Sequence, residues 1–457
     1  MPVFDFDEDA FDRDFERVHL EEPDPIETVV DELQDISGAV NSSDGDDTDT
    51  YTPQAFEGHL LAPEMTMAID INTKRRRRSS LYSRMSVKSG QPSSFSELLI
   101  PEGYDNSKHV TGKTLRDFKP LKVLGQGAYG KVYLVEDITT GKLFAQKQLR
   151  KPAIHIQEDV HAKQVARTLS ERDILTNITH HANVVKLFYA FHDQDKFYLI
   201  LEYIPGGELF HHLTLANNTL GNVFPEDDVA FYVAQMALAV KHLHGLGIVY
   251  RDLKPENCLL NSEGNLVLTD FGLSKSISEG DGSICTSIIG TPEYMAPEVL
   301  KGEDYGFGVD WWSLGVVIYD MMLGKPPFTG NSHKAILDKI MKNKLKIPYY
   351  FSMDLKDLLN KLLNKNPDKR YQVDDKWDDF KKHRFFRKIQ WQKLEKQELR
   401  PPIVPIITDL RAAENFLEEF TGMKISLTEE GPLGEISDFR GFSYCASDSY
   451  VSKYINV

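Results

Sequence analysis

The stretch from Ile248 to Gly272, IVYRDLKPENCLLNSEGNLVLTDFG, constrains the fold of this chain more than any other. Two short apolar runs, Cys-Leu-Leu and Leu-Val-Leu, flank a polar Asn-Ser-Glu-Gly-Asn segment, which predicts a tight β-hairpin. Asp252 and Asn257 precede the hairpin and Asp270 follows it. Two carboxylates and an amide held in this way can bind Mg²⁺ through oxygen ligands and leave one carboxylate facing a substrate hydroxyl.

Composition places the chain among proteins with a packed core. It has 457 residues, 41% of them hydrophobic, which is enough for one large domain with tails or for two to three average domains. Three widely spaced cysteines, Cys258, Cys285 and Cys445, argue against a disulfide framework or a zinc site and suit a reducing compartment. We find neither a signal peptide nor an apolar run of about 20 residues, so we expect no membrane insertion.

Charge separates an acidic tail from the rest of the chain. Residues 1–73 hold 21 acidic and two basic residues, and the whole chain has a net charge of −16, so the remainder carries +3. We expect residues 1–110 to be mostly disordered, because they are rich in polar residues and have few sustained apolar periods. No nucleic-acid-binding module surrounds the basic run at 74–78, so we expect no nucleic-acid partner.

A glycine-rich segment at 124–132 carries the pattern GxGxxG. Dinucleotide-binding folds share this pattern, but there a helix follows the glycines directly. Here a β-rich alternating run follows at 131–135, and a second strand begins at 143 after a turn. The glycines therefore lie in a β-hairpin, where backbone N–H groups can approach phosphates. Lys147 ends the returning strand and would be costly to bury without an anion beside it.

These motifs together resemble the eukaryotic protein kinase family. The resemblance implies an α+β, two-lobed fold over 118–386, with a small β-rich N-lobe, a larger helical C-lobe and a disordered N-terminal tail. In that family the first aspartate, here Asp252, orients the substrate hydroxyl and accepts its proton while ATP donates its γ-phosphate. The catalytic residues that the resemblance implies are Asp252, Lys254, Asn257, Asp270 and Thr291, with Asn257 and Asp270 as the Mg²⁺ ligands.

The resemblance also implies the nucleotide site. Lys147 would position the phosphates and pair with Glu171, on a helix predicted over 165–178, and the backbone of Glu202 and Ile204 would bond adenine. Glu208 would reach the ribose or a basic substrate residue. The residues expected to bind ATP are Leu124, Gly125, Gln126, Gly127, Ala128, Tyr129, Gly130, Lys131, Val132, Ala145, Lys147, Glu171, Glu202, Ile204, Glu208 and Leu259.

The subgroup follows from the catalytic loop and the C-terminal tail. Tyr250-Arg251-Asp252 and Lys254 are typical of serine/threonine kinases of the AGC group. Within 387–457, the segment 415–421 resembles the AGC tail that crosses the nucleotide cleft, and 439–444 resembles the hydrophobic motif, which fills a groove beside the helix of Glu171. The likeness is greatest to the N-terminal kinase of the ribosomal S6 kinase and mitogen- and stress-activated kinase branch.

Three residues are candidate phosphorylation sites by the same resemblance: Ser287 in the activation segment, Thr428 in the turn motif and Ser443 in the hydrophobic motif. Ser287 stands in Ser-Ile-Ile-Gly, where relatives have Thr-Phe-Cys-Gly, so the upstream kinase is left open. A phosphate on Ser287 would be bound by three basic residues, which are Arg251, Lys275 and Arg167.

Substrate preference can be argued from charge. Glu208, Glu256 and Asp320 fall where basophilic AGC kinases bind arginine upstream of the acceptor, which predicts Arg-x-x-Ser/Thr substrates. Ser79 and Ser80 obey the same rule. The basic run is therefore a solvated charge run with nuclear-import capacity, a segment that enters the enzyme's own substrate groove, or a site that a related kinase phosphorylates. We expect protein substrates and upstream activating kinases as partners, a monomer, and a cytoplasmic and nuclear location.

Two alternatives remain to be weighed. A pseudokinase or ATP-binding scaffold would need a broken catalytic set, yet Lys147, Asp252, Asn257 and Asp270 are all present. A dinucleotide-dependent oxidoreductase would need a helix after Gly130, where the sequence instead predicts a strand.

Overall fold

The computed structural model describes residues 113–127, 130–151, 158–178, 181–215, 224–277, 284–425 and 441–454. The acidic region and the basic run at 74–78 lie outside the described residues, as do Ala128, Tyr129, Thr428 and Phe439. None of the described helices is both long enough and apolar enough to cross a bilayer.

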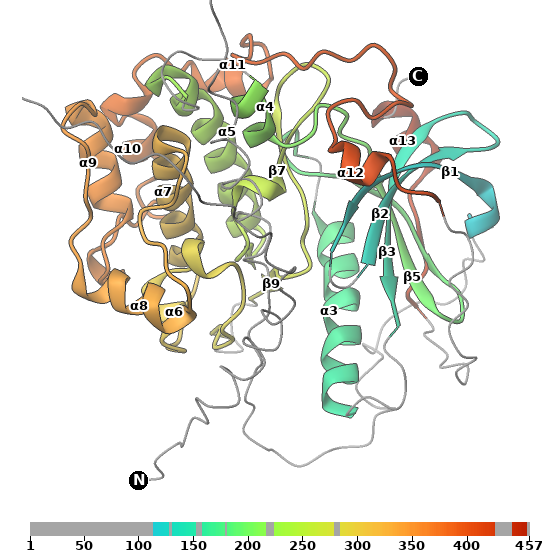
Figure 1. Ribbon diagram of the computed structural model, residues 1–457, viewed down its shortest axis with the longest axis horizontal. Helices are drawn as coiled ribbons and strands as arrows, with labels where there is room; N and C mark the ends of the chain where they lie inside the picture. Colours follow the sequence, from blue (N-terminus) through green and yellow to red (C-terminus); the bar gives the residue numbers. More distant parts are fainter. Residues whose placement is uncertain are drawn as a thin grey trace, which may run out of the picture. The chain divides into compact units, whose positions relative to one another are not determined.

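A six-stranded antiparallel sheet with one long helix beside it forms the smaller lobe (Figure 1). The strands lie in the order β1-β2-β3-β5-β4-β10, so the last strand of the chain joins the sheet next to β4. The elements of this lobe are the 3-10 helix η1 (Leu115–Asp117), β1 (Phe118–Gln126), β2 (Gly130–Asp137), β3 (Leu143–Arg150), α3 (Glu158–Asn177), β4 (Leu187–His192), β5 (Lys196–Glu202) and β10 (Tyr444–Cys445).

The two faces of this sheet follow from the alternation of side chains along its strands. On the outer face, Phe118, Phe144 and Tyr189 join an aromatic cluster whose ring centroids lie about 6 Å apart. On the inner face, Ala145 and Lys147 of β3 point towards the other lobe. Gly130, which begins β2, cannot be replaced, because a Cβ there would lie 1.7 Å from the carbonyl oxygen of Gln148.

The larger lobe is helical, with two short two-stranded sheets on its side facing the smaller lobe. Its helices α5 and α7 pack together, and Trp311 and Trp312 on α7 are fully buried. The elements are α4 (Leu209–Leu215), α5 (Glu226–Gly245), β6 (Ile248–Val249), η2 (Pro255–Asn257), β7 (Cys258–Leu260), β8 (Leu266–Leu268), β9 (Lys275–Ser276), η3 (Pro292–Tyr294), α6 (Pro297–Leu300), α7 (Gly308–Leu323), α8 (His333–Lys342), α9 (Met353–Leu362), η4 (Pro367–Lys369), α10 (Trp377–Lys381), η5 (Arg384–Phe386) and α11 (Trp391–Glu395).

The expected hairpin is present, since β7 pairs antiparallel with β8 and Asn261 accepts hydrogen bonds from the turn. The helix expected over 165–178 is longer than predicted at its N-terminal end, because α3 begins at Glu158. Arg370 forms a buried two-bond ion pair with Glu298, at 2.5 and 2.8 Å.

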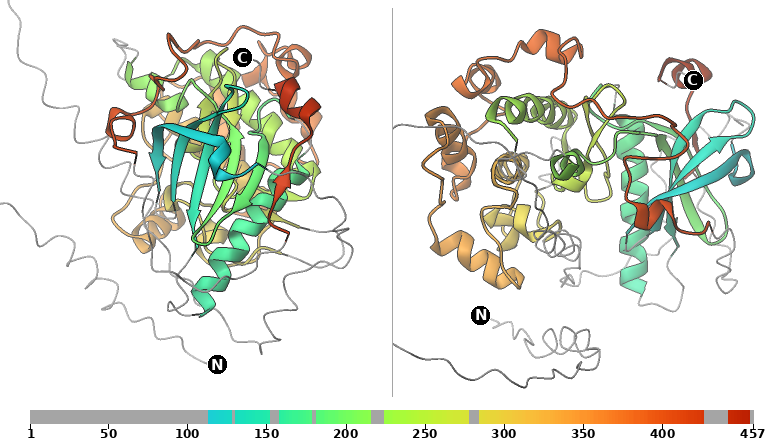
Figure 2. Two further views of the ribbon diagram at one scale, coloured as in Figure 1. Left: turned by 90° about the vertical axis from the view of Figure 1, so that its right-hand side faces the viewer. Right: turned by 45° about the horizontal axis from the view of Figure 1, so that its top comes forward.

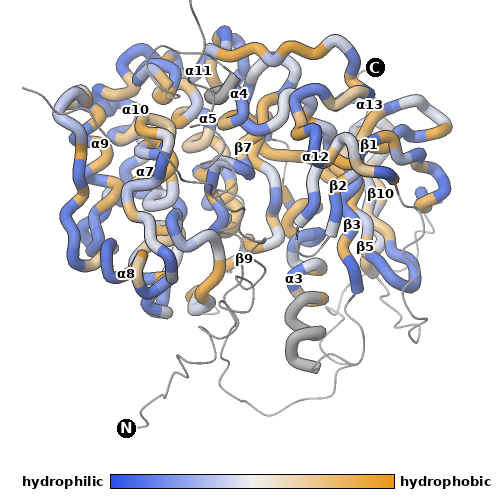
Figure 3. The backbone as a smooth tube through the Cα atoms, in the orientation of Figure 1, coloured by the Kyte–Doolittle hydropathy of each residue, from blue (hydrophilic) through white to orange (hydrophobic). Residues whose placement is uncertain are grey.

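The chain after α11 returns from the larger lobe to the smaller one (Figure 2). Its extended part, with the exposed Val404 and Ile406, is hydrophobic along much of its length (Figure 3). The segment then forms α12 (Glu418–Thr421) against β1, and the chain ends in β10 and α13 (Asp448–Tyr454) on the smaller lobe.

Candidate active site

Lys147 joins the two lobes through two ion pairs. Its Nζ lies 2.6 Å from Oε1 of Glu171 on α3 and 2.8 Å from Oδ1 of Asp270, which follows β8. The Glu171 carboxylate is buried, whereas 47% of the Asp270 side chain is exposed to the cleft. The predicted convergence of Lys147, Glu171 and Asp270 is therefore present in the structure.

Asp252 lies across the cleft with only one of its carboxylate oxygens engaged. Oδ2 accepts hydrogen bonds from Lys254 Nζ at 2.9 Å and Asn257 Nδ2 at 2.8 Å. Oδ1 is buried and has no hydrogen-bond partner. Lys254 also donates to Thr291 Oγ1 at 3.3 Å. An unpaired buried carboxylate oxygen is costly, and a donor group such as a hydroxyl would satisfy it.

The ionisation of the two aspartates differs because their surroundings differ. Burial raises the pKa of Asp252 to about 6, against the opposing effect of Lys254. Asp270 is also desolvated, but its ion pair with Lys147 prevails and lowers its pKa to about 2. The two carboxylates in turn raise the pKa of Lys147, despite its burial, so Lys147 is charged at neutral pH. The cleft thus holds a permanent cation, a permanent anion and a carboxylate able to take up a proton.

The residues around Asp270 fit a hard divalent cation. The Asn257 amide donates its hydrogens to Asp252, to the main-chain oxygen and to Oδ2, both at 2.8 Å, which leaves the amide oxygen as a ligand. Asp270 retains its second oxygen beyond the contact with Lys147. In the described part of the chain, no group of three or more His, Cys, Asp or Glu side chains could hold a metal alone. Asn257 and Asp270 would therefore share the cation with phosphate oxygens, as Mg²⁺ usually requires.

The described residues predicted to line a nucleotide site come from both lobes and lie beside the tail. Leu124, Val132 and Ala145 form one apolar cluster with Tyr203 and Phe416, and the last two rings stack at 6.1 Å. Leu201 and Ile204 are buried at the start of the connection between the lobes. Glu208 pairs with Leu259 through an antiparallel bridge, which places these two predicted residues side by side. The tail segment 415–421 thus packs through Phe416 against Tyr203, in the connection between the lobes.

Glycines allow the tail to approach this connection closely. Gly207 has a φ of +68°, and a Cβ there would lie 2.1 Å from the carbonyl oxygen of Asn415. The Asn415 amide also donates to the Pro205 carbonyl at 3.2 Å. The tail therefore lies in direct contact with the connection between the lobes.

The activation segment meets two of the three predicted phosphate-binding cations. Arg251 donates to the carbonyl of Leu273 at 2.6 Å and to the hydroxyl of Tyr305 at 3.3 Å, and Tyr305 in turn donates to the carbonyl of Ser287 at 2.8 Å. Lys275, on β9, donates to the Ile284 carbonyl at 3.4 Å. Helix α3, which carries the third cation, Arg167, contacts β9.

The predicted arginine-binding carboxylates do not all face solvent. Glu256 is exposed and Glu208 is half-buried. Asp320 is wholly buried and its Oδ2 accepts the Tyr294 hydroxyl at 2.6 Å, so we remove Asp320 from the set that reads arginine directly. The sequence did not indicate Glu293 as a site residue. Burial and the negative charge of Glu256 raise the pKa of Glu293, and its Oε2 is buried without a hydrogen-bond partner.

The described part of the hydrophobic motif, residues 441–444, lies beside the helix of Glu171, as the resemblance implied. Phe442 is fully buried, with its ring 4.7 Å from that of Phe197 on β5. Arg172, next to Glu171 on α3, lies 5.7 Å from the Phe442 ring and donates to the Gly441 carbonyl at 2.7 Å. Ser443 is exposed. The tail thus contacts the helix that holds Glu171.

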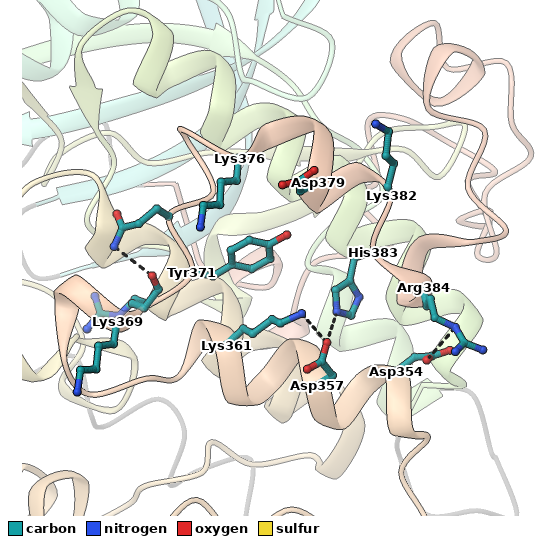
Figure 4. A pocket seen from close by; sticks show the side chains of 12 residues that line it. Asp354, Asp357, Lys361, Lys369, Tyr371, Lys376, Asp379, Lys382, His383 and Arg384 are labelled. Atoms are coloured by element: carbon teal, nitrogen blue, oxygen red, sulfur yellow. Dashed lines mark hydrogen bonds and ion pairs between the residues drawn. The ribbon is translucent and has the colours of Figure 1, made fainter.

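A hollow of about 630 Å³ lies away from this cleft, between α9, α10 and η5 (Figure 4). Lysine and aspartate side chains line it, and several are already paired: Lys361 and His383 both bond to Asp357, at 2.6 and 2.9 Å. Its mixed and partly neutralised charge favours no nucleotide, so the interlobe cleft remains the candidate site.

Comparisons with known proteins agree with this geometry. Residues 118–386 match the family model described as "Protein kinase domain". "Serine/threonine-protein kinase YPK3" of Saccharomyces cerevisiae is 47% identical over 409 residues, covering 75% of this chain and 77% of that protein. A "RAC family serine/threonine-protein kinase homolog" of Dictyostelium discoideum is 40% identical, covering 78% of each chain. "Ribosomal protein S6 kinase alpha-2" of Mus musculus is 41% identical over 81% of this chain but only 51% of that protein, so the chain spans about half of that relative.

Proposed function

This chain belongs to the protein kinase family, as an AGC-type serine/threonine kinase with ATP as its substrate, and from that premise we propose how its cleft transfers phosphate and selects proteins. The observation that carries the proposal is the pair of oxygens of Asp252, one held by Lys254 and Asn257 and the other buried and unpaired.

Asp252 orients the acceptor hydroxyl through its unpaired Oδ1 and takes up the proton as the oxygen attacks the γ-phosphorus. A bond forms between the acceptor oxygen and this phosphorus, the bond from the phosphorus to the β,γ-bridging oxygen breaks, and ADP leaves. Lys254 bears positive charge beside the transferred group, and Lys147, oriented by Glu171, holds the other phosphates. Asn257 and Asp270 would hold Mg²⁺, which would neutralise charge on the phosphates when bound.

A transfer assay with a serine peptide tests these roles. Asp252→Asn keeps the shape of the side chain and removes its basicity, so we expect kcat to fall by about 10²–10⁴-fold with the KM for ATP little changed. The exposed Asp375 provides a matched Asp→Asn control that should retain wild-type rates. An equal effect of both variants, or none, would refute the role of Asp252.

Substrates of this kinase carry arginine upstream of the acceptor. Glu256 and Glu293 support this preference, because they place two carboxylates close together and leave one oxygen of Glu293 unpaired. A bidentate arginine would satisfy both carboxylates. On a peptide array, Glu293→Gln should weaken the preference for arginine by about tenfold or more while leaving an arginine-free peptide unaffected. No preference for arginine in the wild-type protein would contradict the proposal.

Phosphorylation of Ser287 activates the enzyme. Two contacts support this. Lys275 donates to the Ile284 carbonyl, three residues before Ser287, and Arg251 donates to the Tyr305 hydroxyl, which itself donates to the Ser287 carbonyl; a phosphate on Ser287 could replace these contacts. After treatment with an activating kinase, Ser287→Ala should be less active than the wild-type protein, whereas the control Thr286→Ala should not. If Ser287→Ala lost no activity, the proposal would be refuted. Activation through Ser443 and Thr428, a monomeric state and a cytoplasmic and nuclear location remain predictions from the sequence.

A further inference from the structure

A chain of three side chains, two of them buried and one half-buried, connects the far side of the larger lobe to the catalytic loop. Asp310, on α7, accepts the backbone N–H of Tyr250 at 2.8 Å and that of Arg251 at 2.7 Å. His244, at the end of α5, lies with Nε2 2.9 Å from Asp310 Oδ2. The other ring nitrogen, Nδ1, lies 3.0 Å from both oxygens of Asp374, which belongs to the segment between η4 and α10.

This geometry requires His244 to carry a positive charge. Each ring nitrogen faces a carboxylate, and a neutral imidazole has one N–H to donate, so its other nitrogen would place a lone pair against an anion. Only the imidazolium satisfies both contacts. The ring is 2% exposed and Asp310 is 0% exposed, so solvent cannot replace either partner in the contact between His244 and Asp310.

Asp374 is itself held in place from several sides. The indole Nε1 of Trp311 donates to its Oδ2 at 2.7 Å, and Lys241 Nζ lies 3.3 Å from its Oδ1. The charged groups that face His244 are thus Asp310 on α7 and Asp374 opposite, with Lys241 beyond Asp374 on the same helix as the histidine. The rings of Phe307 and Trp311 cover the remaining sides.

The main chain that Asp310 holds is strained. Arg251 has a φ of +66°, a conformation that costs an ordinary residue free energy and persists only when its surroundings enforce it. Asp252, the next residue, depends on this conformation for its direction in the cleft. A carboxylate that shifted towards a neutral histidine would hold these two N–H groups less firmly.

We propose that Asp374 is a positioning residue for phosphoryl transfer, which keeps His244 protonated and so fixes Asp310 against the backbone of Tyr250 and Arg251. Asp374 touches neither substrate nor ATP. The proposal rests on the proposed function of Asp252, but its structural part can be measured without it.

The pH dependence has a defined sign. The two carboxylates raise the pKa of His244 above its ordinary value, although burial opposes them. The stability that protonated His244 contributes to the fold is complete below the pKa of a histidine in the unfolded chain. It is lost as the pH rises through the pKa of His244 in the folded protein. Activity should therefore fall as the pH rises through the pKa of His244, which sets the alkaline limb of the pH–rate profile.

Asp374→Asn is the main test, with Asp375→Asn as a matched control at the exposed neighbouring position. We expect the alkaline limb of kcat for Asp374→Asn to move down by about one pH unit or more, because one of two charges that hold the proton is gone. The KM for ATP should stay within about twofold, and kcat at pH 8 should fall about tenfold. Hydrogen exchange of the amides at 250 and 251 should accelerate in this variant and not in the control.

Lys241→Gln gives the opposite sign and decides the matter if Asp374→Asn does not fold. Removing the cation beside Asp374 strengthens the hold of that carboxylate on His244, so the limb should move up, which no general loss of structure would produce. A fall in kcat with an unmoved limb, a limb that moves down in Lys241→Gln, or unchanged amide exchange would overturn the proposal. Faster exchange in a chain that lacks kinase activity in every form would refute the proposed function and leave the role of Asp374 standing.

Discussion

Removal of the Phe442 ring is the perturbation whose size the structure defines best. The side chain is fully buried, which stabilises its docked position by about 1.5–3 kcal/mol. Its contact with Phe197 at 4.7 Å adds about 0.5–1.5 kcal/mol, and the Arg172 guanidinium at 5.7 Å adds about 0.5–1 kcal/mol. The sum of these contributions agrees with the free energy that Phe→Ala typically costs in a core, about 3–5 kcal/mol. We use the lower end of that range, about 3 kcal/mol.

A loss of about 3 kcal/mol weakens docking of the tail about 10²-fold. Arg172 would then lose its contacts on the helix turn that carries Glu171, so that the ion pair with Lys147 forms in fewer molecules. We expect kcat/KM of Phe442→Ala to fall at least about tenfold, with faster hydrogen exchange in α3. The assay is peptide phosphorylation at saturating and limiting ATP.

Tyr349→Ala is the control, since it deletes an aromatic ring that is 91% exposed and should change stability by less than about 0.5 kcal/mol. The reasoning would be refuted if Phe442→Ala folded, kept an activity within twofold of the control and showed no added exchange in α3.

Three further predictions concern the cleft and the core. Lys147→Met should lower kcat/KM for ATP about 10²–10³-fold in an ATP turnover assay without unfolding the protein, because the cation between two carboxylates is lost. Arg370→Met should destabilise the protein by about 3–5 kcal/mol in denaturant unfolding, since it leaves Glu298 buried and unpaired, and a second change, Glu298→Met, should restore part of the loss. Gly207→Ala should raise the KM for ATP several-fold, because its positive φ and the nearby Asn415 carbonyl leave no room for a Cβ; an unchanged KM would contradict the part played by the tail in the pocket.

Local sequence patterns predicted the elements that carry the chemistry. Periodicity and turn residues were sufficient for the β7–β8 hairpin and for the strand after Gly130, since these are set by near neighbours in the chain. The convergence of Lys147 with Glu171 and Asp270 was predicted only because of the resemblance to kinases, since contacts 24 and 123 residues apart leave no periodic signal.

Residues whose role depends on burial escaped prediction. Asp320 and Glu293 are both acidic. Asp320 is buried and accepts the Tyr294 hydroxyl, whereas Glu293 keeps a carboxylate oxygen without a hydrogen-bond partner. Nothing in the sequence distinguishes them. The sequence did not indicate a role for Asp374 either, because its neighbour Asp375 has the same side chain. The two residues differ only in the folded protein, where Asp374 contacts Trp311 and His244.

The pairing of β10 with β4 has a consequence for truncated forms of this protein. Tyr444 and Cys445 cover main-chain groups of Tyr189 and Ala190 that would otherwise form an open sheet margin beside an aromatic surface. Such a margin is a template for association with another molecule. A chain that stops before Tyr444 should therefore self-associate, which would be visible as concentration-dependent light scattering. The pairing of β10 with β4 thus keeps the smaller lobe from associating with other molecules.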